Sequence, residues 1–270
     1  MILLAGVGFL LFPVAVIFFS SSHDTATLAR DGLQISFGDN ARENYKAVFS
    51  LSGGFFDQIT AATMLKNSLI IGTGVASLTT AFSILSAYAI VYLKFPMANL
   101  LFWVIFATLL FPLESRFVTT FQITAYLGLI NTHLGIILPT LAAALGTFFF
   151  RQFFLTLPEE LAEAARMDGA GPLRFFWDFI LPLSWARAGA VFVVSFMIGW
   201  NQFLWPLMIS TDESLYTLVR GIRFIGQESG PGMALVVISM LPPFVLLLAF
   251  QRWFFSNLAG SNVQSSDRHG

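Results

Sequence analysis

The side chains with the clearest chemistry are a few charged and amide groups beside long apolar runs. Glu114 and Arg116 lie two positions apart at the end of one such run. An arginine suits a phosphate because its planar guanidinium donates two hydrogen bonds to one anion at once. Charged groups held in lipid-like surroundings are costly and often functional, so this pair could belong to a polar site on a solute pathway. A local ion pair or an interfacial anchor is the alternative.

Two amide side chains, Asn201 and Gln202, lie inside another apolar run, and Trp200 and Trp205 flank them. A lining of amides and aromatic rings suits polyols or sugars. An aromatic belt at a membrane surface would explain the tryptophans as well. These four residues, with the acidic and basic pair above, are the candidate solute contacts.

Other site chemistries lack the residues that they need. The chain has no Cys, which excludes disulfides and thiolate sites. None of its three Lys residues follows a GxxxxG pattern, so no ATP-binding loop is predicted. The histidines are too far apart for a metal motif: His23, His133 and His269. We expect neither a metal site nor a catalytic site in this chain.

The elements that position these residues must be built for lipid. Of 270 residues, 56% are hydrophobic, 11% are charged and 31 are Phe, whereas soluble domains are about 25% charged. A soluble globule of this size needs more polar surface than the chain offers. The net charge of −1 provides no basic surface for nucleic acid.

Gaps between charged residues predict how the chain crosses a bilayer. Six gaps hold at least 19 uncharged positions each, and a helix needs about 20 apolar residues to cross. Lipid cannot satisfy backbone groups, and barrel strands would alternate apolar and polar residues. We therefore predict an all-α, polytopic membrane protein. Its six transmembrane helices are expected near 2–19, 68–92, 98–113, 134–154, 187–209 and 233–254.

The two ends of the chain and its orientation in the membrane are less directly indicated by the sequence. A signal peptide is an alternative for the first run, but no Lys or Arg precedes it and it is too long for an ordinary apolar core. We expect one membrane domain over 1–255 and a flexible tail over 256–270. The 14 basic residues divide seven to seven between the two sides, so the positive-inside rule leaves the orientation open.

One loop, 156–183, is too polar for lipid and too patterned for a linker. Thr156 and Glu159 fit a capping box, which predicts a helix start. Gly169 is a favourable stop, because a left-handed residue costs least as glycine. A second helix should restart at Pro172 and end at Leu181–Pro182.

The two helices of this loop predict different surfaces. The first exposes Ala164 and Ala165 between the carboxylates of Glu163 and Asp168, which suits a basic groove on a partner. A solvated connector is the alternative. The second helix is expected to lie on the bilayer with its apolar side chains inward: Leu173, Phe175, Phe176, Phe179 and Ile180.

These residues carry a family resemblance. Glu163-Ala164-Ala165, then Gly169, then Leu181-Pro182 resembles the EAA loop of bacterial ABC importer permeases, with Phe179 where that family usually has Ile. Three further segments look like the carbohydrate-type (MalG-like) branch: Asn67-Ser68, Asn131-Thr132 and 200–207. Segments 111–117 and 150–154 are similar to permeases for glycerol 3-phosphate or glycerophosphodiesters.

The resemblance implies a type I importer fold in a bacterial inner membrane. It implies that the loop is a cytoplasmic coupling helix, with both termini inside and segments 20–66, 114–133 and 210–232 outside. The implied partners are a second permease, an ATPase dimer that binds ATP and Mg, and an extracytoplasmic solute-binding protein. The implied ATPase-coupling residues are Glu163, Ala164, Ala165, Asp168, Gly169, Leu181 and Pro182.

Two alternatives remain at this point. The same family includes permeases for sugars and oligosaccharides, which the residues do not separate from those for glycerol phosphates. An ion-coupled secondary transporter would show internal repeats and midplane acidic residues, and neither is visible here.

Overall fold

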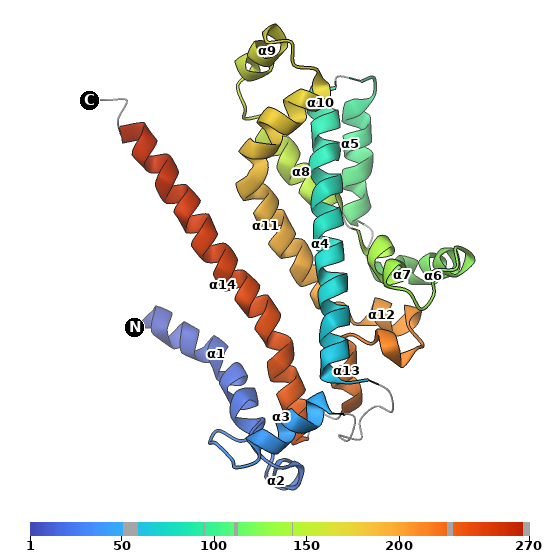
Figure 1. Cartoon of the computed structure of the whole chain (residues 1–270), viewed down its shortest axis with the longest axis vertical. Helices are drawn as coiled ribbons and strands as arrows, with labels where there is room; N and C mark the ends of the chain where they lie inside the picture. Colours follow the sequence, from blue (N-terminus) through green and yellow to red (C-terminus); the bar gives the residue numbers. More distant parts are fainter. Residues whose placement is uncertain (51–58, 94, 111–112, 142, 226–228, 267–270) are drawn as a thin grey trace. The chain divides into compact units, whose positions relative to one another are not determined.

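The computed structural model describes residues 1–50, 59–93, 95–110, 113–141, 143–225 and 229–266 (Figure 1). All regular structure in these ranges is helical, as predicted. The α-helices are α1 (Ile2–Ser20), α2 (Thr25–Asp31), α3 (Ala41–Phe49), α4 (Ala61–Tyr92), α5 (Ala98–Ala107), α6 (Phe117–Tyr126), α7 (His133–Ile137), α8 (Ala143–Phe154), α9 (Glu159–Met167), α10 (Pro172–Phe175), α11 (Leu181–Trp200), α12 (Leu204–Ile209), α13 (Leu218–Ile225) and α14 (Gly230–Ser266). Short 3₁₀ turns cover Thr108–Leu110, Leu113–Arg116, Leu138–Thr140 and Glu213–Leu215, and Phe176–Ile180 is π-helical.

Four helical stretches in the described ranges are long and apolar enough to cross a bilayer: Leu3–Ser20, Ala61–Tyr92, Pro172–Trp200 and Gly230–Gln251. The span predicted over 134–154 is instead two helices, bent by 48° between Thr140 and Ala143. The span predicted over 98–113 is a shorter apolar helix, Ala98–Leu110. The all-helical membrane fold is confirmed, and four of the six predicted spans are single long helices.

The span predicted over 187–209 has different ends. Its helix is continuous from Pro172 and stops at Trp200, with α12 following after a break. Pro206 is the physical cause, because a proline has no N–H for the carbonyl four residues earlier and its ring clashes with that carbonyl. At the other end of the chain, α14 continues to Ser266, and the flexible tail over 256–270 stays a prediction. Residues 267–270 lie outside the described ranges.

The chain divides into two compact units. The first comprises 1–71, 128–136 and 200–245, and the second comprises 72–127, 137–199 and 246–270. In the first unit, the largest fully buried side chains come from α4, α7, α12, α13 and α14: Met64, Ile71, Ile136, Pro206, Ile209, Leu218 and Leu235. Gly221 allows α13 to approach α4, because any β-carbon there would collide with the sulfur of Met64.

The second unit has an aromatic core. Tyr88 and Phe150 are buried there with Phe154, Phe175 and Phe176. The rings meet edge-on or tilted, with 5.1 Å between the centroids of Tyr88 and Phe176, the geometry that ring quadrupoles favour. This core lies under the loop that the sequence marks as a docking surface.

Candidate functional site

Helix α9 begins at Glu159 without the predicted capping box. Pro158 is the N-cap residue and no side chain caps the helix. The Thr156 hydroxyl instead donates to the Phe153 carbonyl, at 2.7 Å, so it satisfies the end of α8. Glu159 and Glu160 lie in the first turn of α9, where the helix dipole favours negative charge.

The end of α9 agrees with the prediction. Gly169 has a φ of +75°, the left-handed conformation that favours glycine. Its N–H donates to the Arg166 carbonyl at 3.0 Å, and the Ala170 N–H donates to the Ala165 carbonyl at 2.9 Å. These two hydrogen bonds make a Schellman motif, which sets the direction in which the chain leaves α9.

The prediction that Ala164 and Ala165 are both exposed is half wrong. Ala165 is 2% exposed and belongs to the aromatic core of the second unit. Leu161 and Ala162 pack against the same core, since positions three and four apart share one helix face. Ala164 lies on the opposite side and is exposed.

The exposed face of α9 is acidic with a small apolar centre. It consists of Glu160, Glu163, Ala164, Met167 and Asp168, and Gly169 is exposed beside it. The Met167 side chain is 83% exposed and was not among the predicted residues. Its spacing of three from Ala164 was the signal that could have identified it.

The second part of the loop is not a surface helix. Phe175, Phe176 and Ile180 are buried in the protein's own core, and the Tyr88 hydroxyl donates to the Pro172 carbonyl at 2.7 Å. Pro172 does start α10, as predicted.

Leu181–Pro182 does not end this helix, because α11 starts there and the helical stretch runs on to Trp200. The π-helical turn Phe176–Ile180 directly precedes Pro182, and such turns widen the hydrogen-bond pattern where a helix is interrupted. The loop is therefore joined to a membrane span without a flexible connection.

The two tryptophans among the candidate solute contacts have structural partners. Trp200 is 2% exposed and its indole N–H donates to the Ser239 carbonyl at 3.2 Å. Trp205 is 4% exposed and donates to the Gly135 carbonyl at 3.1 Å. A proline follows each acceptor by four residues, Pro243 and Pro139, so each carbonyl lacks its usual helical donor. Neither indole fits the expected pathway lining or the interfacial belt.

Asn201 and Gln202 lie in the break between α11 and α12. Asn201 is exposed and Gln202 is half-buried. The Gln202 Oε1 atom is buried and has no hydrogen-bond partner among the described residues. Arg116 is exposed and belongs to the other unit. The side chain of Glu114 lies outside the described ones.

Arg220 is a residue whose setting the sequence did not reveal. It lies in segment 210–232, which the resemblance places outside the membrane, and it is only 5% exposed. Its guanidinium donates to the carbonyls of Pro206, at 3.1 Å, and Ser210 and lies 3.7 Å from the centre of the Tyr216 ring. Burial lowers the pKa of this guanidinium. Arg220 therefore closes the C-terminal end of α12.

The residues that carried the branch resemblance hold the segment after α12. The Asn67 amide donates to the carbonyls of Ser214, at 2.7 Å, and Tyr216, at 3.1 Å, and its oxygen lies 3.0 Å from His133 Nε2. Ser68 Oγ accepts from the Leu218 N–H at 2.9 Å. These side chains thus have structural roles in the first unit.

The second unit contains a hollow of about 620 Å³ between α4, α11 and the segment of α14 near Phe250. Its lining is apolar apart from the hydroxyls of Ser77 and Thr80. None of the candidate solute contacts lines it. In the described part of the chain, no group of three His, Asp or Glu residues could hold a metal ion.

The spans and the α9–α10 loop together define a membrane transport subunit. The model of the family described as binding-protein-dependent transport system inner membrane component matches residues 1–259. The chain belongs to this family of ABC importer permeases, so it is a transport subunit and not an enzyme.

Individual relatives narrow this class. The chain is 42% identical over 265 residues to the sn-glycerol-3-phosphate transport system permease protein UgpE of Yersinia pestis, which covers 96% of this chain and 94% of the relative. UgpE of Salmonella typhi is 41% identical with the same coverage. A bacterial ABC transporter involved in import of the acidic polysaccharide alginate has a similar fold, with a TM-score of 0.79, 20% identity and 94% of each chain covered.

Proposed function

We propose that this chain is a permease subunit for ATP-driven uptake of glycerol 3-phosphate or glycerophosphodiesters. The observation that carries the proposal is the identity of 40–42% to UgpE proteins over 96% of the chain. A likeness of 20% identity to the alginate importer speaks for the fold and not for a polysaccharide solute.

The proposed complex has this chain, a second permease, an ATPase dimer and an extracytoplasmic solute-binding protein. ATP and Mg bind to the ATPase subunits. Both units of this chain form one permease domain over 1–255, with cytoplasmic termini.

Coupling to ATP hydrolysis is assigned to the exposed face of α9. Glu163 and Asp168 offer carboxylates to basic groups of the ATPase, and Ala164 allows close approach between them. Ala165 holds α9 on the aromatic core, and Gly169 sets the exit of the chain. Leu181 and Pro182 act at the joint with α11 and not as contacts.

Movement of α9 reaches the membrane span mechanically. Leu161 and Ala165 pack on the same core as Phe175 and Phe176, so α9 and the start of the span move as one body. Closure of the ATPase dimer would then tilt the continuous helix Pro172–Trp200, a two-state element biased by nucleotide.

Solute contact is assigned to the break after α11 in the first unit, and a phosphate contact is assigned separately to Arg116 of the second unit. Asn201 and the unpaired oxygen of Gln202 suit the hydroxyl groups of glycerol. Arg116 is exposed and suits a phosphate.

The test is uptake into liposomes by the whole importer, expressed with its neighbouring genes. We expect saturable uptake of glycerol 3-phosphate that depends on ATP, and no uptake of a maltose-like sugar. We expect Arg116→Gln to raise KM for glycerol 3-phosphate, while ATPase activity without solute stays unchanged. Uptake of the sugar alone, or the absence of a co-purifying ATPase, would overturn the proposal.

A further inference from the structure

A short segment of the first unit, 32–38, exposes three large apolar side chains. Leu33 is 56% exposed, Ile35 71% and Phe37 69%. No charged residue lies between Asp31 and Asp39. Exposed apolar groups of this size, side by side outside the membrane spans, mark a surface that contacts another apolar phase.

The segment is held in place by its backbone at the alternate positions. The Gln34 N–H donates to Ser20 Oγ at 2.9 Å, and the Gly38 N–H donates to Ser22 Oγ at 2.8 Å. The Ser36 carbonyl lies 2.9 Å from His23 Nε2. These polar contacts turn one side of the segment toward the protein, so Leu33, Ile35 and Phe37 are presented outward on a rigid support.

This support is the end of a membrane-spanning helix. Ser20 is the last residue of α1, whose stretch Leu3–Ser20 has a mean hydropathy of 2.4 and is only 6% buried. The Phe37 ring packs against Phe18 and Phe19 of α1, with 6.0 and 4.8 Å between ring centroids. The segment therefore lies at the level where α1 leaves the bilayer.

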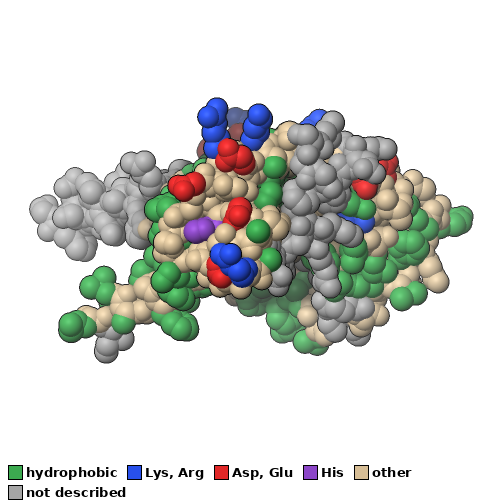
Figure 2. Space-filling view, turned by 90° about the horizontal axis from the view of Figure 1, so that it is seen from below, with side chains coloured by type: hydrophobic (Ala, Val, Ile, Leu, Met, Phe, Trp, Pro, Cys, Tyr) green, Lys and Arg blue, Asp and Glu red, His purple; other side chains and the backbone are tan. Residues whose placement is uncertain are grey.

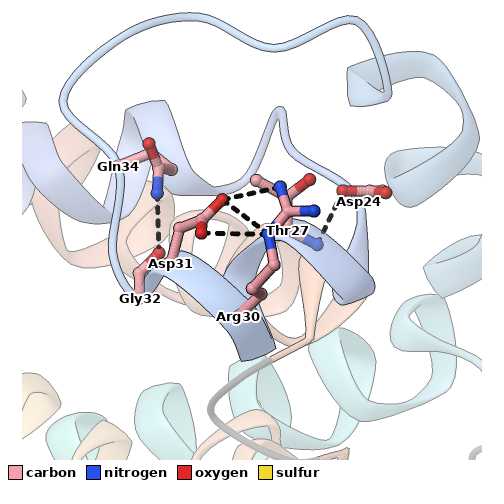
Figure 3. A network of polar contacts seen from close by, with 6 residues as sticks. All are labelled: Asp24, Thr27, Arg30, Asp31, Gly32 and Gln34. Atoms are coloured by element: carbon pink, nitrogen blue, oxygen red, sulfur yellow. Dashed lines mark hydrogen bonds and ion pairs between the residues drawn. The ribbon is translucent and has the colours of Figure 1, made fainter.

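Charged groups border the segment at both ends, and Asp39, which follows it, is exposed. Arg30 and Asp31, at the end of α2, form an exposed ion pair at 2.8 Å, and Gly32 begins the uncharged segment (Figure 3). Seen from the end that carries α2 and α3, basic and acidic side chains gather on one face with hydrophobic side chains beside them (Figure 2). This succession from apolar to charged matches the succession from acyl chains to water at a membrane surface.

We propose that segment 32–38 inserts Leu33, Ile35 and Phe37 into the lipid interface around the end of α1. The occupant is phospholipid, because the exposed Phe37 ring continues the apolar surface of a helix that is itself almost unburied. The segment anchors the α2–α3 region of the first unit to the membrane surface. This role is independent of the solute.

The absence of Cys from the chain makes a site-specific test possible. Ile35→Cys and Leu33→Cys would each carry a nitroxide spin label in the complete importer, reconstituted in liposomes of phosphatidylethanolamine and phosphatidylglycerol. Relaxation by oxygen, which concentrates in lipid, is compared with relaxation by a water-soluble nickel chelate. The matched control is Ala29→Cys, an exposed position on α2.

We expect the labels at 33 and 35 to favour oxygen over the nickel chelate at least several-fold more than the label at 29 does. Equal access of the nickel chelate to all three labels would overturn the proposal. Shielding of labels 33 and 35 from both reagents would also overturn it, because a protein partner then covers the segment. Repeating the measurement without the solute-binding protein identifies which partner that is.

Discussion

Substitutions at Gly169 test the backbone conformation at the end of α9 without changing side-chain contacts. A β-carbon at Gly169 would meet nothing within 4 Å, so Gly169→Ala adds no steric clash. Its cost comes from the φ of +75°, which a residue with a β-carbon adopts at a cost of roughly 1–2 kcal/mol. Asn tolerates this conformation better than Ala.

The expected effects form a graded series. A cost of 1–2 kcal/mol corresponds to about a 5- to 30-fold loss in the population of correctly ended α9. Gly169→Asn should show the smallest loss and Gly169→Ala an intermediate one. Gly169→Pro removes the N–H that donates to Arg166 and forces φ to about −65°, so the Schellman motif is lost completely.

The assay is the ratio of solute imported to ATP hydrolysed by the reconstituted importer. We expect this ratio to be lowered least in Gly169→Asn, more in Gly169→Ala and most in Gly169→Pro. The amount of assembled complex should stay constant because Gly169 is exposed. Gly171→Ala is the matched control, since Gly171 has a φ of −70° and open space around it. Normal coupling in Gly169→Pro would refute the argument that the end of α9 transmits movement.

Three further predictions concern the two faces of α9, the contacts of Arg220 and the N-cap of α2. Ala165→Leu should overpack the aromatic core and lower the free energy of unfolding by about 1–3 kcal/mol. Ala164→Leu should leave thermal stability unchanged and lower the ratio of solute imported to ATP hydrolysed. Equal shifts in melting temperature would contradict the assignment of Ala165 to the buried face of α9 and Ala164 to its exposed face. Arg220→Met leaves the Ser210 carbonyl without its guanidinium donor and removes one of the donors to the Pro206 carbonyl. We therefore expect faster proteolysis of the complex near α12, with Arg220→Lys intermediate. Hydrogen bonds from the Thr27 side chain and from its backbone N–H lower the pKa of Asp24. The capping of α2 should therefore be complete above the ordinary carboxyl pKa of 3.8 and be lost as pH falls through the lowered value. Hydrogen exchange of α2 should show this loss in the native chain and not in Asp24→Asn.

Local rules in the sequence predicted the features that depend on neighbouring residues. Gly169 and Pro172 mark the end of one helix and the start of the next, because φ preference and a missing N–H act within one turn. The family resemblance then placed these helices in a known type of loop. Charge spacing likewise located the long apolar helices.

Features that depend on distant residues were not predictable in the same way. Ala164 and Ala165 are chemically identical, and only the position of the aromatic core decides which one is exposed. The Thr156 hydroxyl lies between the end of α8 and the start of α9. It donates to the Phe153 carbonyl at the end of α8 and does not cap α9. Arg220 is buried because carbonyls 10 and 14 residues earlier in the chain face it, which no local pattern indicates.

The pairing of indoles with proline-freed carbonyls imposes a joint constraint on evolution of this chain. The indole N–H of Trp205 satisfies the Gly135 carbonyl, which Pro139 deprives of its helical donor, and Trp200 does the same for the Ser239 carbonyl below Pro243. Loss of the tryptophan alone leaves a buried carbonyl unsatisfied, while loss of the proline alone makes the indole bond redundant. The order of replacement therefore matters in each pair, whose members are 66 and 43 positions apart: the proline can be lost first without leaving this carbonyl unsatisfied, and the tryptophan cannot.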